Sequence, residues 1–283
     1  MVARLRHVTY GTTQTDISVV GHWWRSNDAR RGHPRPSDGP DRGTARVLRC
    51  RRLPAGRAVT RPVDQHPTYG EFAAQSQVAD IAADLVGPDV TFHHSTLNFT
   101  WARGGAEVKW HQDIQAWPHT NYSPLTIGTY LYDCGMDQGP LGVLPGSHDG
   151  ELYDLYDDER RWVGSLSDAD AATIPADRTV YLPGPAGSIT IHNCRLLHHS
   201  AANHSDIGRP LLLNVYSAAD AMPYTPDPLD SSHAGEIVRG TPATWARHDP
   251  RPCLIPPDWS GGYSGLFALQ QKEDRARTVP TQQ

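Results

Sequence analysis

From residue 90 onward, short runs of β-branched and aromatic residues alternate with turns rich in glycine and proline. Such runs between turn residues are typical of β-strands. The candidate strands are 91–101, 108–113, 126–132, 142–144, 179–182, 187–193 and 211–217. Many short strands of this kind are typical of a double-sheet jelly roll. The 24 Pro and 25 Gly residues favour the same turn-rich, mainly β architecture over a helical bundle.

One segment before these runs has the period of a helix instead. Thr68 and Glu71 have the spacing of a capping box, in which two side chains bond backbone N–H groups at a helix start. Apolar residues then recur at helical spacing, at Ala74, Val78, Ile81 and Leu85. Gly87 and Pro88 are typical of a helix end. The sequence therefore predicts one helix from residue 68 that flanks the strands.

The 283 residues divide into three expected parts. Residues 1–67 contain two candidate strands, 5–10 and 45–50, around a loop rich in Arg, Gly, Pro and Asp. Residues 68–271 form the main domain, and 272–283 form a polar tail. Within the main domain, residues 218–271 carry aromatic residues among prolines, which predicts a packed flap over the strands. These aromatic residues are Tyr224, Trp245, Trp259, Tyr263 and Phe267.

His111 and Asp113 place an imidazole and a carboxylate two residues apart. On an extended strand this spacing directs both side chains to the same face. One histidine and one carboxylate are two of the three ligands in the 2-His-1-carboxylate site, which binds non-haem Fe(II) and leaves coordination positions open. Without a second histidine, a hydrogen-bonded His–Asp pair on the surface would be the better interpretation.

A second histidine follows far downstream. His198 and His199 are adjacent, and only one of them can face the interior of a strand, because side chains alternate. The alternation does not choose between them. Arg209 follows His198 by eleven positions and precedes an apolar run. An unpaired charge in apolar surroundings is costly, so this guanidinium favours a bound carboxylate over a surface salt bridge.

Three motifs occur in order along the chain. They are 110–113 (Trp-His-Gln-Asp), 137–148 (Asp-Gln-Gly-Pro-Leu-Gly-Val-Leu-Pro-Gly-Ser-His) and 198–203 (His-His-Ser-Ala-Ala-Asn), followed by Arg209. This series resembles the phytanoyl-CoA dioxygenase (PhyH-like) family of Fe(II)- and 2-oxoglutarate-dependent oxygenases. The resemblance implies a mainly β fold, a double-stranded β-helix of the jelly-roll or cupin-like kind, with flanking helices.

The resemblance also assigns roles to single residues. It implies that the metal ligands are His111, Asp113 and His198, the histidine that opens the third motif. It implies that Arg209 pairs with the distal carboxylate of 2-oxoglutarate, assisted by Ser200.

Further side chains are expected around the metal. Related proteins often carry a lysine that assists 2-oxoglutarate where Asn98 to Thr100 stand here. This chain has no charge at those positions, so a second anchor is expected from Asn98 or Thr129, or is missing. The candidates for substrate contact are Trp117, His119, Tyr130, Tyr132 and His192. Packing in the core is the alternative for each of them.

The resemblance implies that the chain uses O2 and 2-oxoglutarate to hydroxylate an unactivated C–H bond. It does not name the substrate, but the aromatic residues after Asp113 favour a small metabolite, as in the tailoring of secondary metabolites. Asp113 favours hydroxylation over halogenation, because halogenases of this type replace the carboxylate with a small residue. Desaturation, epoxidation and cyclisation stay open. The alternatives are a non-catalytic jelly-roll binding protein and a redox-neutral cupin-type metalloenzyme. Neither alternative explains Arg209.

The composition limits the kinds of partner and the cellular location that can be expected. A net charge of −5 and a pI near 6.3 argue against nucleic acid, which favours basic surfaces. No apolar run is long enough to span a membrane, and the N-terminus lacks the apolar stretch of a signal peptide. The four cysteines are scattered, which predicts neither a disulfide framework nor a structural zinc site. We therefore expect a cytoplasmic protein with a small-molecule substrate. The oligomeric state is not indicated.

Overall fold

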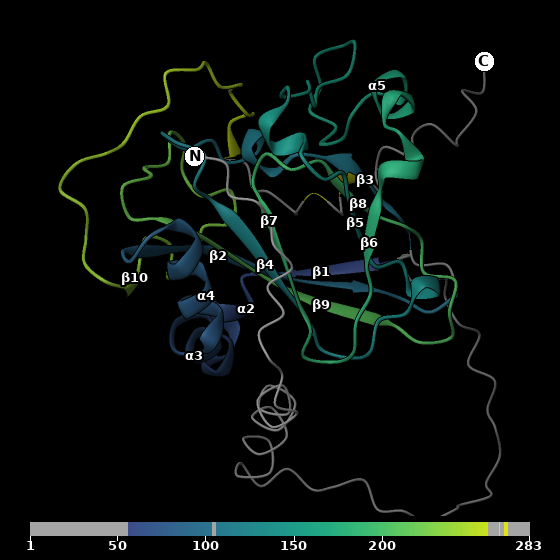
Figure 1. Ribbon diagram of the computed structural model, residues 1–283, viewed down its shortest axis with the longest axis horizontal. Coiled ribbons are helices and arrows are strands. Elements are labelled where there is room, and N and C mark those ends of the chain that lie inside the picture. Colours follow the sequence, from purple (N-terminus) through teal and green to yellow (C-terminus); the bar gives the residue numbers. More distant parts are fainter. Residues whose placement is uncertain (1–55, 104–105, 260–265, 267–268, 271–283) are drawn as a thin grey trace, which may run out of the picture.

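The computed structural model describes residues 56–103, 106–259, 266 and 269–270, and its strands form two antiparallel sheets (Figure 1). In order across the larger sheet, the strands are β1 (Gly56–Thr60), β2 (Val90–Thr100), β9 (Arg209–Ala218), β4 (Leu125–Tyr130) and β7 (Ile189–Asn193). β10 (Ile237–Arg239) also pairs with β2. The smaller sheet has the order β3 (Val108–His111), β8 (His198–Ser200), β5 (Leu141–Val143) and β6 (Val180–Leu182).

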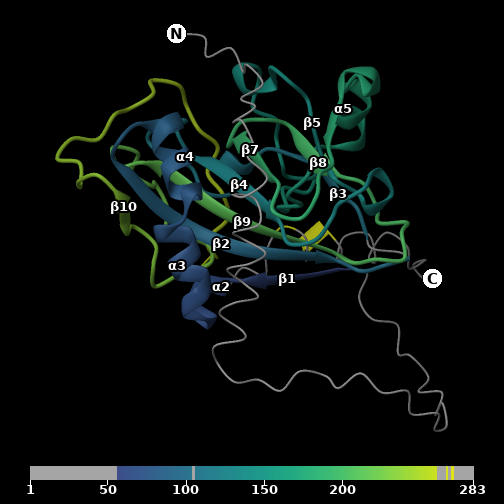
Figure 2. The same cartoon turned by 60° about the horizontal axis from the view of Figure 1, so that its bottom comes forward.

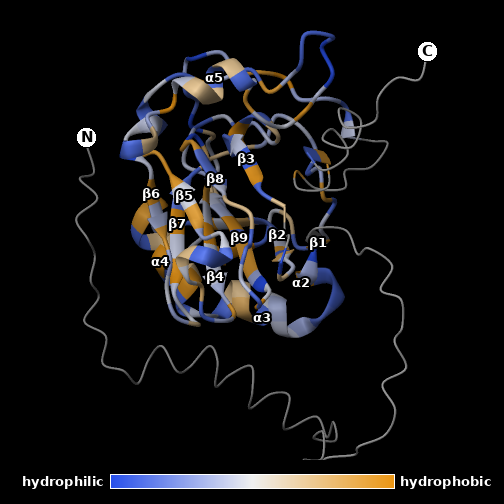
Figure 3. Ribbon diagram, turned by 90° about the vertical axis from the view of Figure 1, so that its right-hand side faces the viewer, coloured by the Kyte–Doolittle hydropathy of each residue, from blue (hydrophilic) through white to orange (hydrophobic). Residues whose placement is uncertain are grey.

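This arrangement confirms the expected mainly β, jelly-roll fold with flanking helices. Within the described residues, the two sheets do not join into a closed barrel. Each of the seven candidate strands is present, with small shifts at its ends. β1 and β10 were not among the candidate strands, and β8, the strand expected to carry His198 and His199, had been given no bounds. Figure 3 shows hydrophobic residues concentrated in the strands and hydrophilic residues in many connections.

Three helices, α2 (Pro62–Gln65), α3 (Pro67–Gln75) and α4 (Gln77–Val86), lie beside the larger sheet (Figure 2). α5 (Asp168–Thr173) lies apart from them, near the smaller sheet. The main apolar core lies between these three helices and the sheet. Its buried members include Phe72, Val78, Ala79, Ala82, Phe92, Ile127, Leu212 and Tyr216. The Tyr216 hydroxyl, from β9, donates a hydrogen bond to the Ala73 carbonyl across this core at 2.8 Å.

The prediction of one continuous helix from residue 68 was wrong. α3 already starts at Pro67, a residue suited to the first helical turn, and the Nδ1 atom of His66 accepts a hydrogen bond from the Thr68 N–H. Ser76 then interrupts the helix, because its backbone is extended and its hydroxyl accepts from the Val78 N–H at 3.2 Å. α4 ends at Gly87 (φ 117°), as the sequence predicted.

The larger sheet includes residues that precede residue 68, where the domain was expected to start. β1 pairs along its whole length with β2, from Gly56 opposite Thr100 to Thr60 opposite Thr96. We therefore propose that the folded domain includes residue 56 onward. The candidate strands 5–10 and 45–50 and the tail 272–283 lie outside the described residues.

The expected flap is only partly packed. Trp259 packs against Trp162, with ring centroids 5.8 Å apart, and its indole N–H donates to the Ala116 carbonyl. By contrast, Tyr224 and Trp245 are exposed. Tyr263 and Phe267 lie outside the described residues. Among the helices that the structure describes, none is long and apolar enough to cross a membrane.

Candidate metal centre

Strand pairing brings two histidines together. His111 is the last residue of β3 and lies directly opposite His198, the first residue of β8. Opposed residues on neighbouring strands direct their side chains to the same face at close spacing. The two imidazole centroids are accordingly 4.1 Å apart, and both rings are buried.

Asp113 reaches the same point although β3 ends before it. Gln112 keeps an extended backbone (φ −127°, ψ 138°), so Asp113 returns to the face of His111 as it begins a short 3-10 helix, Asp113–Gln115. The Gln112 amide donates to the Arg195 carbonyl at 2.7 Å, which holds this turn in place. The Oδ1 atom of Asp113 is 3.6 Å from the Nε2 atoms of both His111 and His198. Three donor atoms therefore converge.

In both His111 and His198, the hydrogen bond of the ring nitrogen that points away from Asp113 determines the tautomer. The Nδ1 atom of His111 lies 2.7 Å from the Lys109 carbonyl, and that of His198 lies 2.9 Å from the Leu196 carbonyl. A carbonyl only accepts hydrogen bonds, so each Nδ1 carries the proton and each Nε2 presents a lone pair. This pattern of outer hydrogen bonds is typical of histidines that bind metals.

The Asp113 carboxylate is held on its other oxygen. Its Oδ2 atom accepts a hydrogen bond from the Thr126 hydroxyl at 3.1 Å and lies 3.3 Å from the Nε2 atom of His192. Burial alone would raise the pKa of this carboxyl. The neighbouring histidines, His198 first among them, outweigh burial and hold the pKa well below its usual range. Asp113 is therefore an anion whose Oδ1 faces the two imidazoles.

Arg209 is a buried cation with no matching anion among the described residues. It is the first residue of β9 and is 2 % exposed. Within the described chain, its Nε and Nη1 atoms have no hydrogen-bond partner. Burial lowers the pKa of the guanidinium. Because an unpaired buried charge is costly, this guanidinium fits a carboxylate that enters the cavity.

One cavity of about 120 Å³ connects these groups. Asn98 and Ser200 line it together with Arg209, and Trp117 and His192 also contribute to its wall. Of the expected site residues, the structure thus brings together His111, Asp113, His198, Arg209, Ser200, Asn98, Trp117 and His192.

Four of the expected site residues do not line this cavity. Thr129 alternates with Thr126 on β4 and so lies on the opposite face, the side of Ile127 and the helices. The Tyr130 hydroxyl donates to the Leu182 carbonyl at 2.9 Å and links the two sheets, and burial raises its pKa to about 12. Tyr132 is 57 % exposed. The Nδ1 atom of His119 is hydrogen-bonded to the Trp117 carbonyl.

The structure separates the two adjacent histidines of the third motif. His198 faces Asp113, whereas the ring of His199 stacks on Trp110, with centroids 4.1 Å apart. Thr126 and His94 are among the cavity residues that were not expected from the sequence. Strand alternation could have placed Thr126 on the face of β4 that borders the cavity. For His94 alternation gave no indication, because His93 and His94 are adjacent and alternation alone does not say which of them faces the cavity.

Comparisons with known proteins identify the family of the chain. The phytanoyl-CoA dioxygenase (PhyH) family model matches residues 46–211. The chain is 33% identical over 203 residues to a probable alpha-ketoglutarate-dependent hypophosphite dioxygenase of Stutzerimonas stutzeri, covering 71% of this chain and 70% of that protein. It is 29% identical to an ectoine dioxygenase of Sphingopyxis alaskensis, covering 54% of this chain and only 55% of that protein. It is also 29% identical to L-proline trans-4-hydroxylase of Streptomyces griseoviridis, covering 52% and 61%.

Solved structures agree on the fold. The epimerase SnoN, in complex with Fe3+, alpha ketoglutarate and nogalamycin RO, superposes with a TM-score of 0.54 at 22% identity, covering 86% of this chain and 87% of SnoN. The non-heme monooxygenase ThoJ gives a TM-score of 0.54 at 19% identity, covering 78% and 76%. The family match spans more than half of the chain, and the hypophosphite dioxygenase aligns over more than two thirds of both proteins. The chain belongs to the phytanoyl-CoA dioxygenase (PhyH) family.

Proposed function

We propose that this chain is an Fe(II)- and 2-oxoglutarate-dependent dioxygenase that hydroxylates an unactivated C–H bond of a small metabolite. The observation that carries the proposal is the convergence of His111, Asp113 and His198 in one cavity with Arg209, whose Nε and Nη1 atoms have no partner among the described residues. A metal site alone would also suit a structural ion. A buried cation beside it suits an acidic co-substrate as well.

The donor set fits ferrous iron. His111 and His198 would bind through Nε2 and Asp113 through Oδ1, since their other polar atoms are already hydrogen-bonded. Three protein ligands leave coordination positions open for co-substrate and oxygen. Bound iron and 2-oxoglutarate together supply the oxidising chemistry, which the protein itself does not perform.

Arg209 would orient 2-oxoglutarate by gripping its distal carboxylate. A planar guanidinium donates two parallel hydrogen bonds to a carboxylate and so fixes both position and direction. Ser200 and Asn98 line the same cavity and would add neutral polar contacts. Asn98 lies on β2 opposite Leu211, two residues along β9 from Arg209, which supports it over Thr129 as the second anchor.

The rest of the cavity would hold the substrate and exclude water. Its wall includes the apolar side chains of Leu155, Trp162, Pro228 and Leu229, together with Trp117. An apolar wall with few polar groups positions a small ligand and limits the access of water to the reacting centre. This supports a small substrate.

Two observations favour hydroxylation over the alternatives. Asp113 retains the carboxylate that a halogenase lacks. A non-catalytic binding protein or a redox-neutral metalloenzyme leaves the buried guanidinium of Arg209 without a function. Tailoring of a secondary metabolite is a narrower proposal. The named substrates of relatives, ectoine and proline, support a small polar molecule more generally.

Isotope labelling tests this proposal. Purified protein with Fe(II), 2-oxoglutarate, a reductant and ¹⁸O2 is incubated separately with ectoine, L-proline and hypophosphite, the molecules named for its relatives. Slow succinate release should occur even without them. A true substrate should accelerate that release and gain one ¹⁸O atom, detected by mass spectrometry. No succinate above a chelator-treated control under any condition would overturn the proposal.

A further inference from the structure

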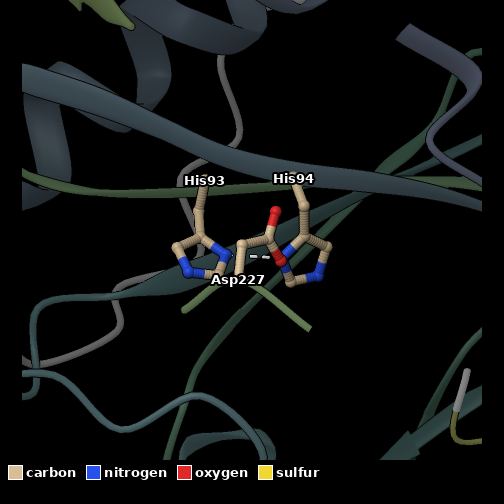
Figure 4. Close-up of side chains that lie close together, drawn as sticks. All are labelled: His93, His94 and Asp227. Atoms are coloured by element: carbon tan, nitrogen blue, oxygen red, sulfur yellow. Dashed lines mark hydrogen bonds and ion pairs between the residues drawn. The ribbon is translucent and has the colours of Figure 1, made fainter. Parts of the chain in front are cut away.

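A second group of metal-type donors lies outside the centre described above. Among the described residues, only two groups of three histidine or carboxylate donors lie close enough to share one ion. The second consists of His93 and His94 on β2 and Asp227 on the connection between β9 and β10 (Figure 4). Its ligand atoms all lie within 4.8 Å of one another.

A β-bulge directs two consecutive histidines to the same side. The pairing of β2 with β9 shifts register between Phe92 and His94. Phe92 packs in the core beneath the helices, whereas His94 lines the cavity between the sheets. In a regular strand His93 and His94 would face opposite ways, but the extra residue of the bulge lets both rings meet. Bulges that re-aim side chains are common beside functional sites.

The carboxylate of Asp227 is fixed by its own turn. Its Oδ1 atom accepts a hydrogen bond from the Leu229 N–H at 3.0 Å, and its Oδ2 atom accepts from the Ser231 N–H at 3.3 Å. Oδ1 also lies 3.9 Å from the Nδ1 atom of His94. Each carboxylate oxygen has a second lone pair, so these bonds orient the group and leave it able to bind a cation.

The two imidazoles meet through their Nδ1 atoms, which are 2.5 Å apart. Both residues are more than nine-tenths buried, and burial disfavours the charged imidazolium. A proton between the rings can be replaced by a metal ion, which binds neutral imidazole. Tetrahedral zinc would need these nitrogens about 3.3 Å apart, so the rings would have to separate by less than about 1 Å.

We propose that His93, His94 and Asp227 form a second divalent-metal site, suited to Zn²⁺. Zinc accepts two imidazole nitrogens and one carboxylate oxygen in a four-coordinate site, with water in the remaining position. The ion joins β2 to the segment that contains Pro228 and Leu229, two residues of the catalytic cavity wall. Its role is to hold that wall in place. The proposal does not depend on the iron chemistry of the first site.

Zinc binding to the full-length protein tests the proposal. The chelator-stripped double variant Asp113→Ala/His198→Ala removes the first centre. Equilibrium dialysis with Zn²⁺ alone should then find one ion per chain. Adding His93→Gln or Asp227→Asn to this background should weaken binding by more than about tenfold. His148→Gln, at a partly exposed histidine, should leave binding unchanged and serves as the matched control.

No zinc in the double variant would overturn the proposal. So would binding that survives both His93→Gln and Asp227→Asn, because the ion would then sit on adventitious surface groups. Anomalous diffraction from zinc-soaked crystals of the unmutated protein answers the same question if a variant fails to fold. A peak between His93, His94 and Asp227 is expected. Its absence at a zinc concentration that fills the first centre contradicts the proposal.

Discussion

Each of the three proposed iron ligands is held by a hydrogen bond on the side away from the metal position. Backbone carbonyls hold His111 and His198, whereas Asp113 depends on the side chains of Thr126 and His192. Side-chain partners can be changed without altering the backbone. The contact between Thr126 and Asp113 therefore offers a direct test of how the carboxylate is oriented.

We predict that Thr126→Val raises the Fe(II) concentration needed for half-maximal succinate release by about 10–100-fold, the usual effect of losing a partner of a metal ligand. Valine keeps the shape of threonine but cannot donate to Asp113. Thr129→Val is the matched control, because Thr129 lies on the other face of the same strand. An equal response of the two variants would show that the hydroxyl does not orient the ligand.

Arg209 has a comparable test with the co-substrate. Removing one partner of a buried charged pair costs on the order of 2–5 kcal/mol, so Arg209→Ala should weaken 2-oxoglutarate binding by more than about thirtyfold. Anaerobic calorimetry of the Fe(II)-loaded protein measures this directly. The exposed Arg178→Ala variant should bind as the unmutated protein does. Unchanged binding in Arg209→Ala would place the anchor elsewhere.

Sequence reasoning could identify His111 and Asp113 because their spacing and strand alternation are local. Strand alternation could not choose between His198 and His199, since that choice depends on which ring faces Trp110 in the smaller sheet, and only the family resemblance selected His198. Thr126 was missed for a similar reason: its role exists only when β4 packs beside the turn after β3.

At the scale of elements, the proposed metal centre depends on a strand of only three residues. β8 lies between β3 and β5 and places His198 opposite both His111 and Val143. The sequence placed His198 and His199 on a strand, but three residues carry too little pattern to give that strand bounds. β1 and β10 were missed altogether, because their pairing with β2 is a long-range contact. The split between α3 and α4 depended on one serine cap.

Gly139 supports the far end of β8, and its substitution should be costly. It has a φ of 67°, and an added Cβ would lie 2.1 Å from the carbonyl oxygen of Ala201, just after β8. Gly146 has a similar left-handed backbone (φ 85°) with open space around it. The left-handed backbone alone costs about 1–2 kcal/mol for alanine.

We therefore predict that Gly146→Ala lowers the free energy of unfolding by about 1–2 kcal/mol, and that Gly139→Ala lowers it by clearly more because of the backbone clash. Urea denaturation of the two variants measures the difference. Equal losses would mean that the end of β8 moves easily away from Gly139, and that this strand is not held as tightly as its neighbours suggest.

At the scale of the whole molecule, the two sheets contribute different residues to the site. The larger sheet is covered by helices on one face and contributes Thr126, His192 and Arg209 on the other. The smaller sheet and the turn after it contribute the three proposed ligands. The mainly β character was predictable from the alternation of short runs and turns. The assembly of the site across two sheets was not, because it depends on pairings between distant segments.

The adjacent histidines of β8 provide the most direct test of the central claim, that His111, Asp113 and His198 form the catalytic iron centre. The measurement is the rate of succinate release from 2-oxoglutarate with Fe(II) and O2 in His198→Ala and His199→Ala. We predict that His198→Ala falls to the level of a chelator-treated control, while His199→Ala, which loses a ring that lines the cavity and stacks on Trp110 but is not a proposed ligand, stays within about tenfold of the unmutated protein. Succinate release that survives in His198→Ala but is abolished in His199→Ala would contradict the account.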